Sequence, residues 1–493
     1  MSPLATLLAR GKKAARHAPW PRVAVDADAW TDAAGLLGRG ECALLGLWGD
    51  GASVHMALLD EAANAVGVLT LACPDGGFPS VGAQHAPAIR LERTIRDLWG
   101  LTPRGAPDDR PWLDHGKWDG GAVIPYAFLP VEGEGLHEIA VGPVHAGIIE
   151  PGHFRFTVNG ETVVRLEQRL GYVHKGVERL MVGKTLDEAA IVAGRLSGDS
   201  TVAWQIAFAR SAEAALGVEV PGRAHFLRAL MAEIERLANH FGDIGAVCND
   251  ATYPLLLAEC GMLRERTLRA ADAAFGHRLM RDRVIPGGVA GDLAPDGGDA
   301  IRSLVTFVRE RFPRIVEIYD GAASLQDRTV TTGIVRPDLV RRFAAGGHVG
   351  RASGRAFDAR KAFAFPPYDI VDFDTPLFGE GDVNARLWVR IREVEQSLAL
   401  VSQILGRLPG GPFFVDLPRK RSGVEGMALV ESFRGDCLAW LRIGADGRIE
   451  RCHLRDPSWF QWPLLEAAIE GDIVADFPLC NKSFNCSYSG HDL

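Results

Sequence analysis

The sequence predicts an α+β protein, with a small N-terminal α+β domain at residues 1–130 followed by a large, mainly helical domain with a small β part at residues 131–493. Before residue 130, alanine-rich helical stretches mix with short β-type runs that are bounded by glycine and proline turns. From residue 177 to about residue 320, apolar residues recur at i, i+3 and i+4 with charges on the opposite face. The Gly-rich residues 132–135 separate the two patterns.

The first 22 residues carry only positive charges, and the first acid is Asp26. This pattern suits either a targeting segment or a solvated amphipathic start, and the lack of a long apolar core favours the solvated start. The basic residues are Arg10, Lys12, Lys13, Arg16 and Arg22.

The rest of the first domain is expected to contain a strand at residues 66–71, which precede a turn at residues 74–77. Apolar and charged residues recur at helical spacing from residue 92, and Gly100 is expected to end this helix. Pro103, Gly105 and Pro107 then impose an extended, turn-rich path.

The second domain begins with short strands and turns at residues 139–164, which predict a β hairpin or small sheet. Helices are predicted at residues 187–195, 201–216 and 223–241, as the core of a helical bundle. After Arg351, Pro- and Gly-rich loops surround one long predicted helix at residues 382–408, and residues 436–453 alternate like strands. No internal repeat is visible.

Composition excludes several functional classes. The 493 residues are 47% hydrophobic and 24% charged with a net charge of −8, which is ordinary for a globular protein and disfavours nucleic acid as the main ligand. The eight cysteines form no CxxC motif, and a reducing compartment fits best. No apolar run reaches the roughly 18 residues of a membrane helix. No GxGxxG or GxxxxGK loop supports a free, nucleotide-dependent oxidoreductase.

Short motifs follow one another in a characteristic order in the second domain. They lie at residues 142–145, 171–178, 220–224, 351–354, 358–361, 381–383 and 431–435, with Glu233, Arg236 and His240 on a predicted helix. Together they resemble the large subunit shared by respiratory complex I and the group 4 nickel-iron hydrogenases. Residues 476–483 resemble the formate hydrogenlyase and hydrogenase-4 branch, and residues 92–110 resemble the smaller complex I subunit that is fused to the large one in this branch.

The resemblance implies a peripheral-arm subunit of a membrane-bound assembly that couples electron transfer to ion translocation, on the cytoplasmic side of the inner membrane. It implies an iron-sulfur small subunit with a [4Fe-4S] cluster, antiporter-like and anchor membrane subunits as partners, and no cofactor bound by this chain alone. Quinone is one expected acceptor, and NAD binding and quinone binding belong to the complex I resemblance. No nucleic acid is expected.

A nickel-iron centre requires four thiolates. The family's first pair lies in an Arg-x-Cys-Gly-x-Cys motif, and the matching stretch here begins at Arg195 and carries Ser197 and Ser200. Counting without gaps from residues 481–483 places Ser487 and Gly490 at the second pair. Cys486 lies one residue away, but one thiolate cannot replace four. We therefore expect no metal at these positions, no hydrogenase activity, and no cleavable tail beyond them.

In complex I the same cavity would hold a quinone headgroup between a histidine and a tyrosine. Counting without gaps puts Gly198 at the tyrosine position, and the loop at residues 146–153 resembles the hydrogenase form instead. There the family glutamate is a proton gate, and Glu150 matches it. The alternative is that Glu150 pairs with an arginine such as Arg155. His153 is either a second polar group at the cavity or a structural histidine.

The remaining candidates rest on the same resemblance. His174 and Arg195 match positions near the partner's iron-sulfur cluster, where cationic groups stabilise a reduced cluster. His145 and His174 lack an i, i+4 partner, which favours structural roles over metal binding. The candidate catalytic residues are Glu150, His153, Arg195, Asp358 and Arg360.

Two alternatives stay open. Arg223, Arg236, His240, Asp358 and Arg360 need partners if buried, so they are either functional groups or members of an ion-pair network. For the whole chain, the alternative to a redox subunit is a non-redox scaffold that docks partner subunits onto antiporter-like membrane proteins. The lost thiolates and lost quinone-bridging positions keep that scaffold open as the alternative.

Overall fold

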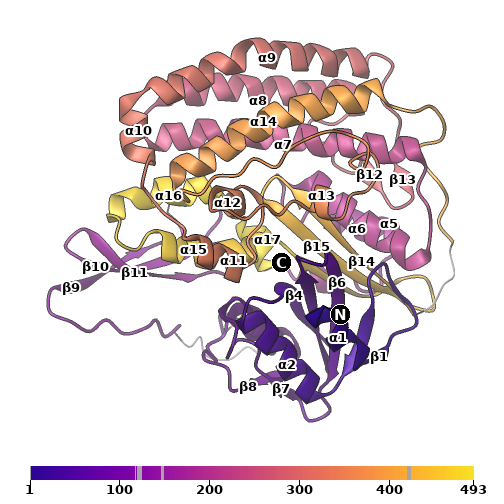
Figure 1. Cartoon of the computed structure of the whole chain (residues 1–493), viewed down its shortest axis with the longest axis vertical. Helices are drawn as coiled ribbons and strands as arrows, with labels where there is room; N and C mark the ends of the chain where they lie inside the picture. Colours follow the sequence, from indigo (N-terminus) through magenta and orange to yellow (C-terminus); the bar gives the residue numbers. More distant parts are fainter. Residues whose placement is uncertain (1, 117, 119–124, 146–148, 419–422) are drawn as a thin grey trace.

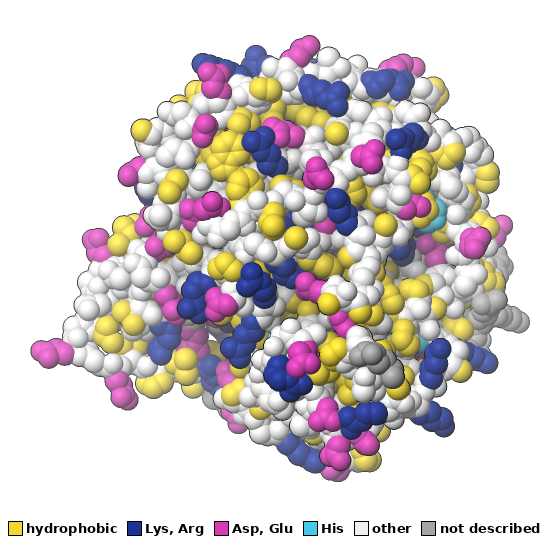
Figure 2. Space-filling view, in the orientation of Figure 1, with side chains coloured by type: hydrophobic (Ala, Val, Ile, Leu, Met, Phe, Trp, Pro, Cys, Tyr) yellow, Lys and Arg dark blue, Asp and Glu magenta, His cyan; other side chains and the backbone are white. Residues whose placement is uncertain are grey.

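A computed structural model describes residues 2–116, 118, 125–145, 149–418 and 423–493. It confirms the α+β class. The first part of the chain forms a sheet with helices against it, and the long helices between residues 222 and 406 lie at the opposite end of the molecule (Figure 1). A second sheet, built near the end of the chain, lies between them. On the face seen in Figure 2, acidic and basic side chains are interspersed.

The N-terminal sheet has the strand order β1-β3-β6-β5-β4. Only the pairing of β3 with β6 is parallel among its four pairings. The predicted strand at residues 66–71 is confirmed as β6, and the predicted helix is confirmed as α3, which ends at Gly100 with φ of +67°. The elements are β1 (Lys12–Lys13), β3 (Arg22–Val25), β4 (Ala43–Asp50), β5 (Ser53–Asp60), β6 (Ala65–Ala72), α1 (Pro3–Ala9), α2 (Ala27–Gly38) and α3 (Ile89–Trp99), followed by the parallel pair β7 (Gly77–Pro79) and β8 (Thr102–Arg104).

Both faces of this sheet are buried, which explains why β4 and β5 are nearly continuous apolar runs. Leu47, Met56 and Leu69 face the helices. On the opposite face, Trp48 joins Trp440 of the C-terminal sheet, with ring centroids 5.5 Å apart. The N-terminal part is therefore packed onto the large part through its second face.

The start of the chain is amphipathic, as expected: Arg10, Lys12, Lys13 and Arg16 are exposed, whereas the apolar face of α1 is buried. Leu4 and Leu7 on α1 are 0% and 3% exposed, because the helix packs on β5 and β6. β2 (His17–Ala18) then leaves the N-terminal sheet and pairs in parallel with β14 of the C-terminal sheet. The first residues thus connect the two sheets.

The large part begins with a three-stranded sheet, β11-β10-β9, where a hairpin or small sheet was predicted. The predicted helices and strands that follow are confirmed, and α7 continues nine residues beyond the predicted end at Phe241. It passes Gly245, where an added Cβ would lie 2.9 Å from Cβ of Cys260, so α7 and α8 pack closely. The elements are β9 (Leu136–Val141), β10 (His153–Asn159), β11 (Thr162–Arg169), α4 (Val177–Met181), α5 (Leu186–Ala193), α6 (Thr201–Leu216), α7 (Gly222–Asp250), α8 (Pro254–Phe275), α9 (Gly297–Gly321) and α14 (Val383–Gly406).

The C-terminal sheet has the order β16-β15-β14-β2, and α6 packs across β14 and β15. At Gly426 an added Cβ would lie 1.8 Å from the carbonyl oxygen of Ser211, so the helix lies directly on the strand. The remaining elements are β12 (Val284–Ile285), β13 (Gly288–Val289), α10 (Ala323–Thr329), α11 (Pro337–Arg342), α12 (Gly347–Ala352), α13 (Ala359–Ala362), β14 (Val424–Ser432), β15 (Gly435–Ile443), β16 (Ile449–Arg455), α15 (Ser458–Ala468), α16 (Phe477–Phe484) and α17 (Tyr488–Asp492).

All eight cysteines are buried and free. Among the described residues, no helix combines the length and the apolar character needed to cross a bilayer.

Candidate functional site

The four positions that match the family's metal ligands come together in space. Ser197 and Ser200 precede α6, and Ser487 caps α17, which contains Gly490. The hydroxyls of Ser197 and Ser487 lie 2.9 Å apart in a hydrogen bond, although 290 positions separate them in sequence. The backbone N–H of Gly490 donates to the Ser487 hydroxyl at 2.9 Å.

An aspartate that the sequence analysis missed organises this site. Oδ1 of Asp199 accepts from the hydroxyls of Ser197 at 2.8 Å and Ser200 at 3.2 Å. The Arg434 guanidinium donates to both carboxylate oxygens of Asp199. Burial opposes ionisation of Asp199, but Arg434 outweighs it and holds the pKa of Asp199 at about 2. Ser197, Asp199, Ser200, Arg434 and Ser487 are called the serine site below.

The serine site does not fit a nickel-iron centre. Because Ser197 donates its only proton to Asp199, Ser487 must donate to Ser197, so these hydroxyls are committed to one another. At Gly490 an added Cβ would lie 2.5 Å from Oδ2 of Asp456, which leaves no room for a larger side chain. A protonated hydroxyl is also a hard ligand, whereas nickel in such a centre takes soft thiolates.

The neighbouring Cys486 does not complete a ligand set. Its sulfur lies 3.9 Å from the side-chain oxygen of Gln461, and burial raises the pKa of its thiol above the ordinary range. The thiol is therefore protonated at neutral pH.

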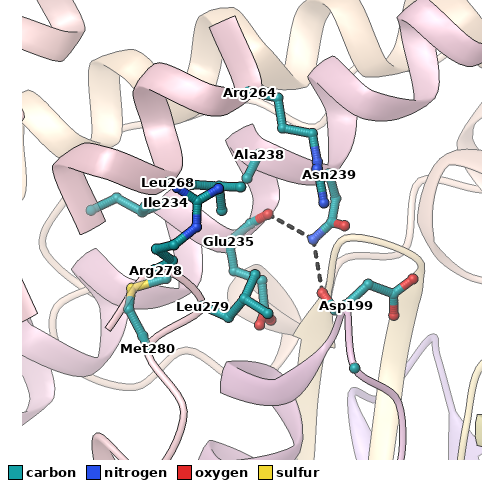
Figure 3. A pocket seen from close by; sticks show the side chains of 11 residues that line it. Asp199, Ile234, Glu235, Ala238, Asn239, Arg264, Leu268, Arg278, Leu279 and Met280 are labelled. Atoms are coloured by element: carbon teal, nitrogen blue, oxygen red, sulfur yellow. Dashed lines mark hydrogen bonds between the residues drawn. The ribbon is translucent and has the colours of Figure 1, made fainter. Parts of the chain in front are cut away.

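A cavity of about 170 Å³ lies beside the Asp199 loop (Figure 3). The side-chain amide of Asn239 on α7 donates to the carbonyls of Asp199 and Glu235, both at 2.8 Å. The Glu235 carboxyl accepts from the backbone N–H groups of Val202 at 2.7 Å and Ala203 at 3.1 Å at the start of α6. Burial nevertheless raises the pKa of Glu235 to about 8.

A second cavity, of about 280 Å³, lies between the β9–β10 loop and the C-terminal helices, and is called the β9–β10 cavity below. Polar side chains from three distant segments line it: His145, Asp250, and Lys482 with Tyr488. Nε2 of His145 is buried and has no hydrogen-bond partner among the described residues. Burial lowers the pKa of His145 and raises the pKa values of Asp250 and Tyr488.

Glu150 connects this loop to the serine site's own helix. Its Oε2 accepts from the backbone N–H of Ser489, next to Gly490, at 3.1 Å. Arg155, the predicted partner of Glu150, instead forms an ion pair with Glu138 at 2.9 Å. Residues 146–148 of the predicted loop lie outside the described residues.

His153 has the geometry of a structural histidine. It lies at the start of β10, where Nδ1 is 3.2 Å from the carbonyl oxygen of Gly142 and Nε2 is 3.4 Å from Nε of Arg155. Burial lowers its pKa below the ordinary value. Both ring nitrogens are thus engaged by neighbours, and the ring does not line the β9–β10 cavity.

His174 and Arg195 lie apart from the serine hydroxyls. Nδ1 of His174 is 2.7 Å from the carbonyl oxygen of Asp492. The Arg195 guanidinium, 41% exposed, makes two hydrogen bonds of 2.7 Å to Asp282. Arg195 is therefore a surface group that is held by a neighbour, and it does not point into the serine site.

Asp358 and Arg360 belong to an ion-pair network, as the structural alternative predicted. Arg360 binds Asp358 at 2.7 Å and Glu233 at 2.9 Å. The seven charged side chains of this group are at most 4% exposed. They are called the buried ion network below: Glu233, Arg236, Arg351, Asp358, Arg360, Glu393 and Glu431. Arg223 lies outside it and pairs with Asp292.

Comparison with known proteins gives results that agree with one another. The family described as "Respiratory-chain NADH dehydrogenase, 49 Kd subunit" matches residues 255–424. "Formate hydrogenlyase subunit 5" of Escherichia coli (strain K12) is 30% identical over 441 residues, which cover 84% of this chain and 77% of that protein. A subunit of the NADH-quinone oxidoreductase of Syntrophobacter fumaroxidans is 31% identical over 358 residues, which cover 72% of this chain and 95% of that protein. "Hydrogenase-4 component G" of E. coli is 28% identical over 463 residues, with 89% and 80% covered.

Proposed function

Because the chain belongs to the large-subunit family of complex I and the group 4 hydrogenases, we propose that it is the acceptor-binding, peripheral-arm subunit of a membrane-bound redox assembly. Electrons reach it from the [4Fe-4S] cluster of an iron-sulfur small subunit, and their transfer is coupled to ion translocation. The acceptor is a quinone.

The β9–β10 cavity is the observation that carries this proposal. Its volume of about 280 Å³ suits a single-ring headgroup more than a whole ligand. Apolar side chains such as Ile149 and Phe154 form its walls, while Lys482 and Tyr488 offer hydrogen-bond donors to carbonyl oxygens. A histidine and a tyrosine therefore line one cavity, although neither occupies the position that the sequence comparison assigns to the family pair.

Reduction of a quinone to a quinol consumes two electrons and two protons. The electrons come from the partner's cluster, and groups at the cavity hand a proton to each carbonyl oxygen. Tyr488 is suited to donate, because its hydroxyl lines the cavity and carries a proton at neutral pH. Asp250 is the second candidate donor, since burial raises the pKa of its carboxyl above the ordinary value. Glu150, hydrogen-bonded to Ser489 beside the cavity, is the group that returns protons from solvent.

Hydrogen chemistry is not part of the proposal, because the serine site does not fit a nickel-iron centre. NAD binding is not part of it either, since the sequence has no phosphate-binding loop. We assign the iron-sulfur small subunit to the face that carries Arg195 and His174. Antiporter-like and anchor subunits hold the assembly at the cytoplasmic side of the inner membrane.

The test uses the complex purified from native membranes in mild detergent, with a tag on this chain. The iron-sulfur absorbance is recorded first, and then the rate of reduction of a short-chain quinone. His145→Ala is expected to lower kcat/KM for the quinone by about tenfold or more, because the cavity loses a polar group. His137→Ala, at an exposed position on β9, is the matched control and leaves the rate unchanged. Equal rates in the two variants would contradict the cavity assignment.

The serine site favours a second candidate function, the non-redox scaffold. Its hydroxyls bind one another and Gly490 is closely packed, as in a retired active site. Membrane partners that purify with the chain but without any iron-sulfur absorbance would support the scaffold over the redox subunit.

A further inference from the structure

The buried ion network contains more carboxylates than cations. Arg351 contacts three carboxylates: Asp358 at 3.0 Å, Glu393 and Glu431. Arg236 is 3.4 Å from Glu233 and 3.7 Å from Glu393. Together with Arg360, three guanidinium groups from α7, α12 and α13 thus face the carboxylates of Glu233, Asp358, Glu393 and Glu431.

The neighbouring polar groups do not supply the missing positive charge. Nε2 of His240 is 2.6 Å from Oε2 of Glu393, and burial lowers the pKa of His240 although Glu393 acts against it, which favours a neutral ring. Ser397 and Tyr368 donate neutral hydrogen bonds to Glu233, both at 2.7 Å. With every carboxylate ionised and the His240 ring neutral, the network carries one unpaired negative charge.

Nearby arginines are each committed to another acid. Arg390 pairs with Asp243 at 3.1 Å and Arg455 with Asp436 at 2.5 Å. Arg434 pairs with Asp199 in the serine site. An unpaired charge that is this deeply buried is costly, and binding a proton removes it.

We propose that the buried ion network is a proton-binding site, which holds one exchangeable proton between Asp358 and Glu431. Both carboxylates contact the same nitrogen, Nη2 of Arg351, and two carboxylates at one site do not both ionise readily. Burial raises the pKa of Glu431 to about 7, although Arg351 acts against it. Burial opposes ionisation of Asp358 too, but Arg360 and Arg351 lower its pKa below the ordinary value. The raised pKa favours Glu431 as the carrier of the proton; its Oε2 also accepts a hydrogen bond from the backbone N–H of Ala359 at 2.9 Å.

One hairpin turn joins this proton site to the serine site. Glu431 lies at the end of β14, and Arg434 in the turn holds Asp199. The Arg236 guanidinium donates to the carbonyls of Glu431 at 3.1 Å and Ser432 at 3.0 Å, so the network also holds the turn. A change of charge at the serine site therefore acts on the Glu431 proton through this turn. The site would supply or store a proton, with no other bond made or broken.

Infrared difference spectroscopy of the purified full chain tests the proposal, because it detects the carbonyl stretch of a protonated carboxylic acid. The chain is titrated on either side of the pKa of about 7. We expect the carbonyl band of protonated Glu431 to disappear as the pH rises. The Glu431→Gln variant should lack this band at every pH. No quinone or electron donor is required, so this result is independent of the proposed function.

The excess of carboxylates over arginines predicts a second result. Glu393→Gln and Asp358→Asn each leave three carboxylates facing three arginines, so each is expected to abolish the Glu431 band although Glu431 is intact. Glu92→Gln is the matched control: burial raises the pKa of Glu92 to about 7 as well, but it binds neutral groups, the Ser80 hydroxyl and the Val81 backbone. This variant loses its own band and keeps that of Glu431. An unchanged spectrum in Glu431→Gln, or a Glu431 band that persists in both charge-balancing variants, overturns the proposal.

Discussion

The serine site and the buried ion network lie on two sides of one hairpin turn, and they satisfy buried polar groups in different ways. The serine site pairs one acid with one arginine and engages its hydroxyls in a chain of hydrogen bonds. The network packs four acids around three arginines. A balanced set of this kind is inert near neutral pH, whereas an unbalanced set must bind or release a proton. Burial alone therefore does not predict whether a polar cluster titrates near neutral pH, but the charge count does.

The largest effect is expected from Arg351→Met, which removes the one cation that three carboxylates share. Breaking a buried ion pair leaves uncompensated charge and costs about 3–5 kcal/mol of unfolding free energy. Urea denaturation of the purified chain measures it. Arg314→Met is the control, because its pair with Glu317 is about 70% exposed on both sides and is expected to change stability by less than about 0.5 kcal/mol. Similar losses of unfolding free energy in both variants would mean that the buried ion network stabilises the fold no more than an exposed ion pair does.

The pH dependence of stability separates the two regions by sign. The pKa of Glu431 is raised from 4.5 to about 7, so the stability it contributes is complete below pH 4.5 and is lost as the pH rises through 7. The pKa of Asp199 is lowered from 3.8 to about 2, so its contribution is complete above pH 3.8 and is lost as the pH falls through 2.

Between about pH 5 and about pH 8, the unfolding free energy of the wild-type chain is therefore expected to fall by about 3 kcal/mol relative to Glu431→Gln. Chemical denaturation at a series of pH values gives the two curves. Parallel curves would mean that Glu431 titrates alike in the folded and unfolded chain.

The smallest effect is expected at the serine site. Ser197→Ala removes hydrogen bonds to Asp199 and Ser487, at 2.8 and 2.9 Å, and is expected to cost about 1 kcal/mol. Ser353 is the matched control, because its hydroxyl is buried without a hydrogen-bond partner among the described residues. Thermal unfolding should show no loss in Ser353→Ala. A neutral Ser197→Ala would mean that the hydroxyl chain contributes nothing to the fold.

Local patterns in the sequence predicted most of the elements. Gly100 ends α3 as expected, and β6 and α14 lie where apolar periodicity placed them. Tertiary contacts account for what was not predicted. The basic residues at the start of the chain are exposed as expected, but the sequence did not show that Leu4 and Leu7 pack on the sheet. The predicted end of α7 ignored the close packing that Gly245 permits against α8.

The candidate site was predictable only in part. The resemblance placed Ser197 and Ser487 at matching positions, and the structure brings them together. Asp199 was missed, although it is the one charged residue between Ser197 and Ser200. The β9–β10 cavity has no local signature, because His145, Asp250 and Lys482 come from segments that meet only in the folded chain. The roles of Glu150, His153, His174 and Arg195 stay predictions.

The parallel pairing of β2 with β14 has a consequence during synthesis. His17 and Ala18 leave the ribosome more than 400 residues before their partners, Glu425 and Gly426. Until then the outer face of the N-terminal sheet, with Trp48, Ala57 and Val68, lacks its cover. Nascent domains generally fold as they emerge, so this early sheet would present an apolar surface through most of translation. A cell making this protein must shield that face until the last strands arrive.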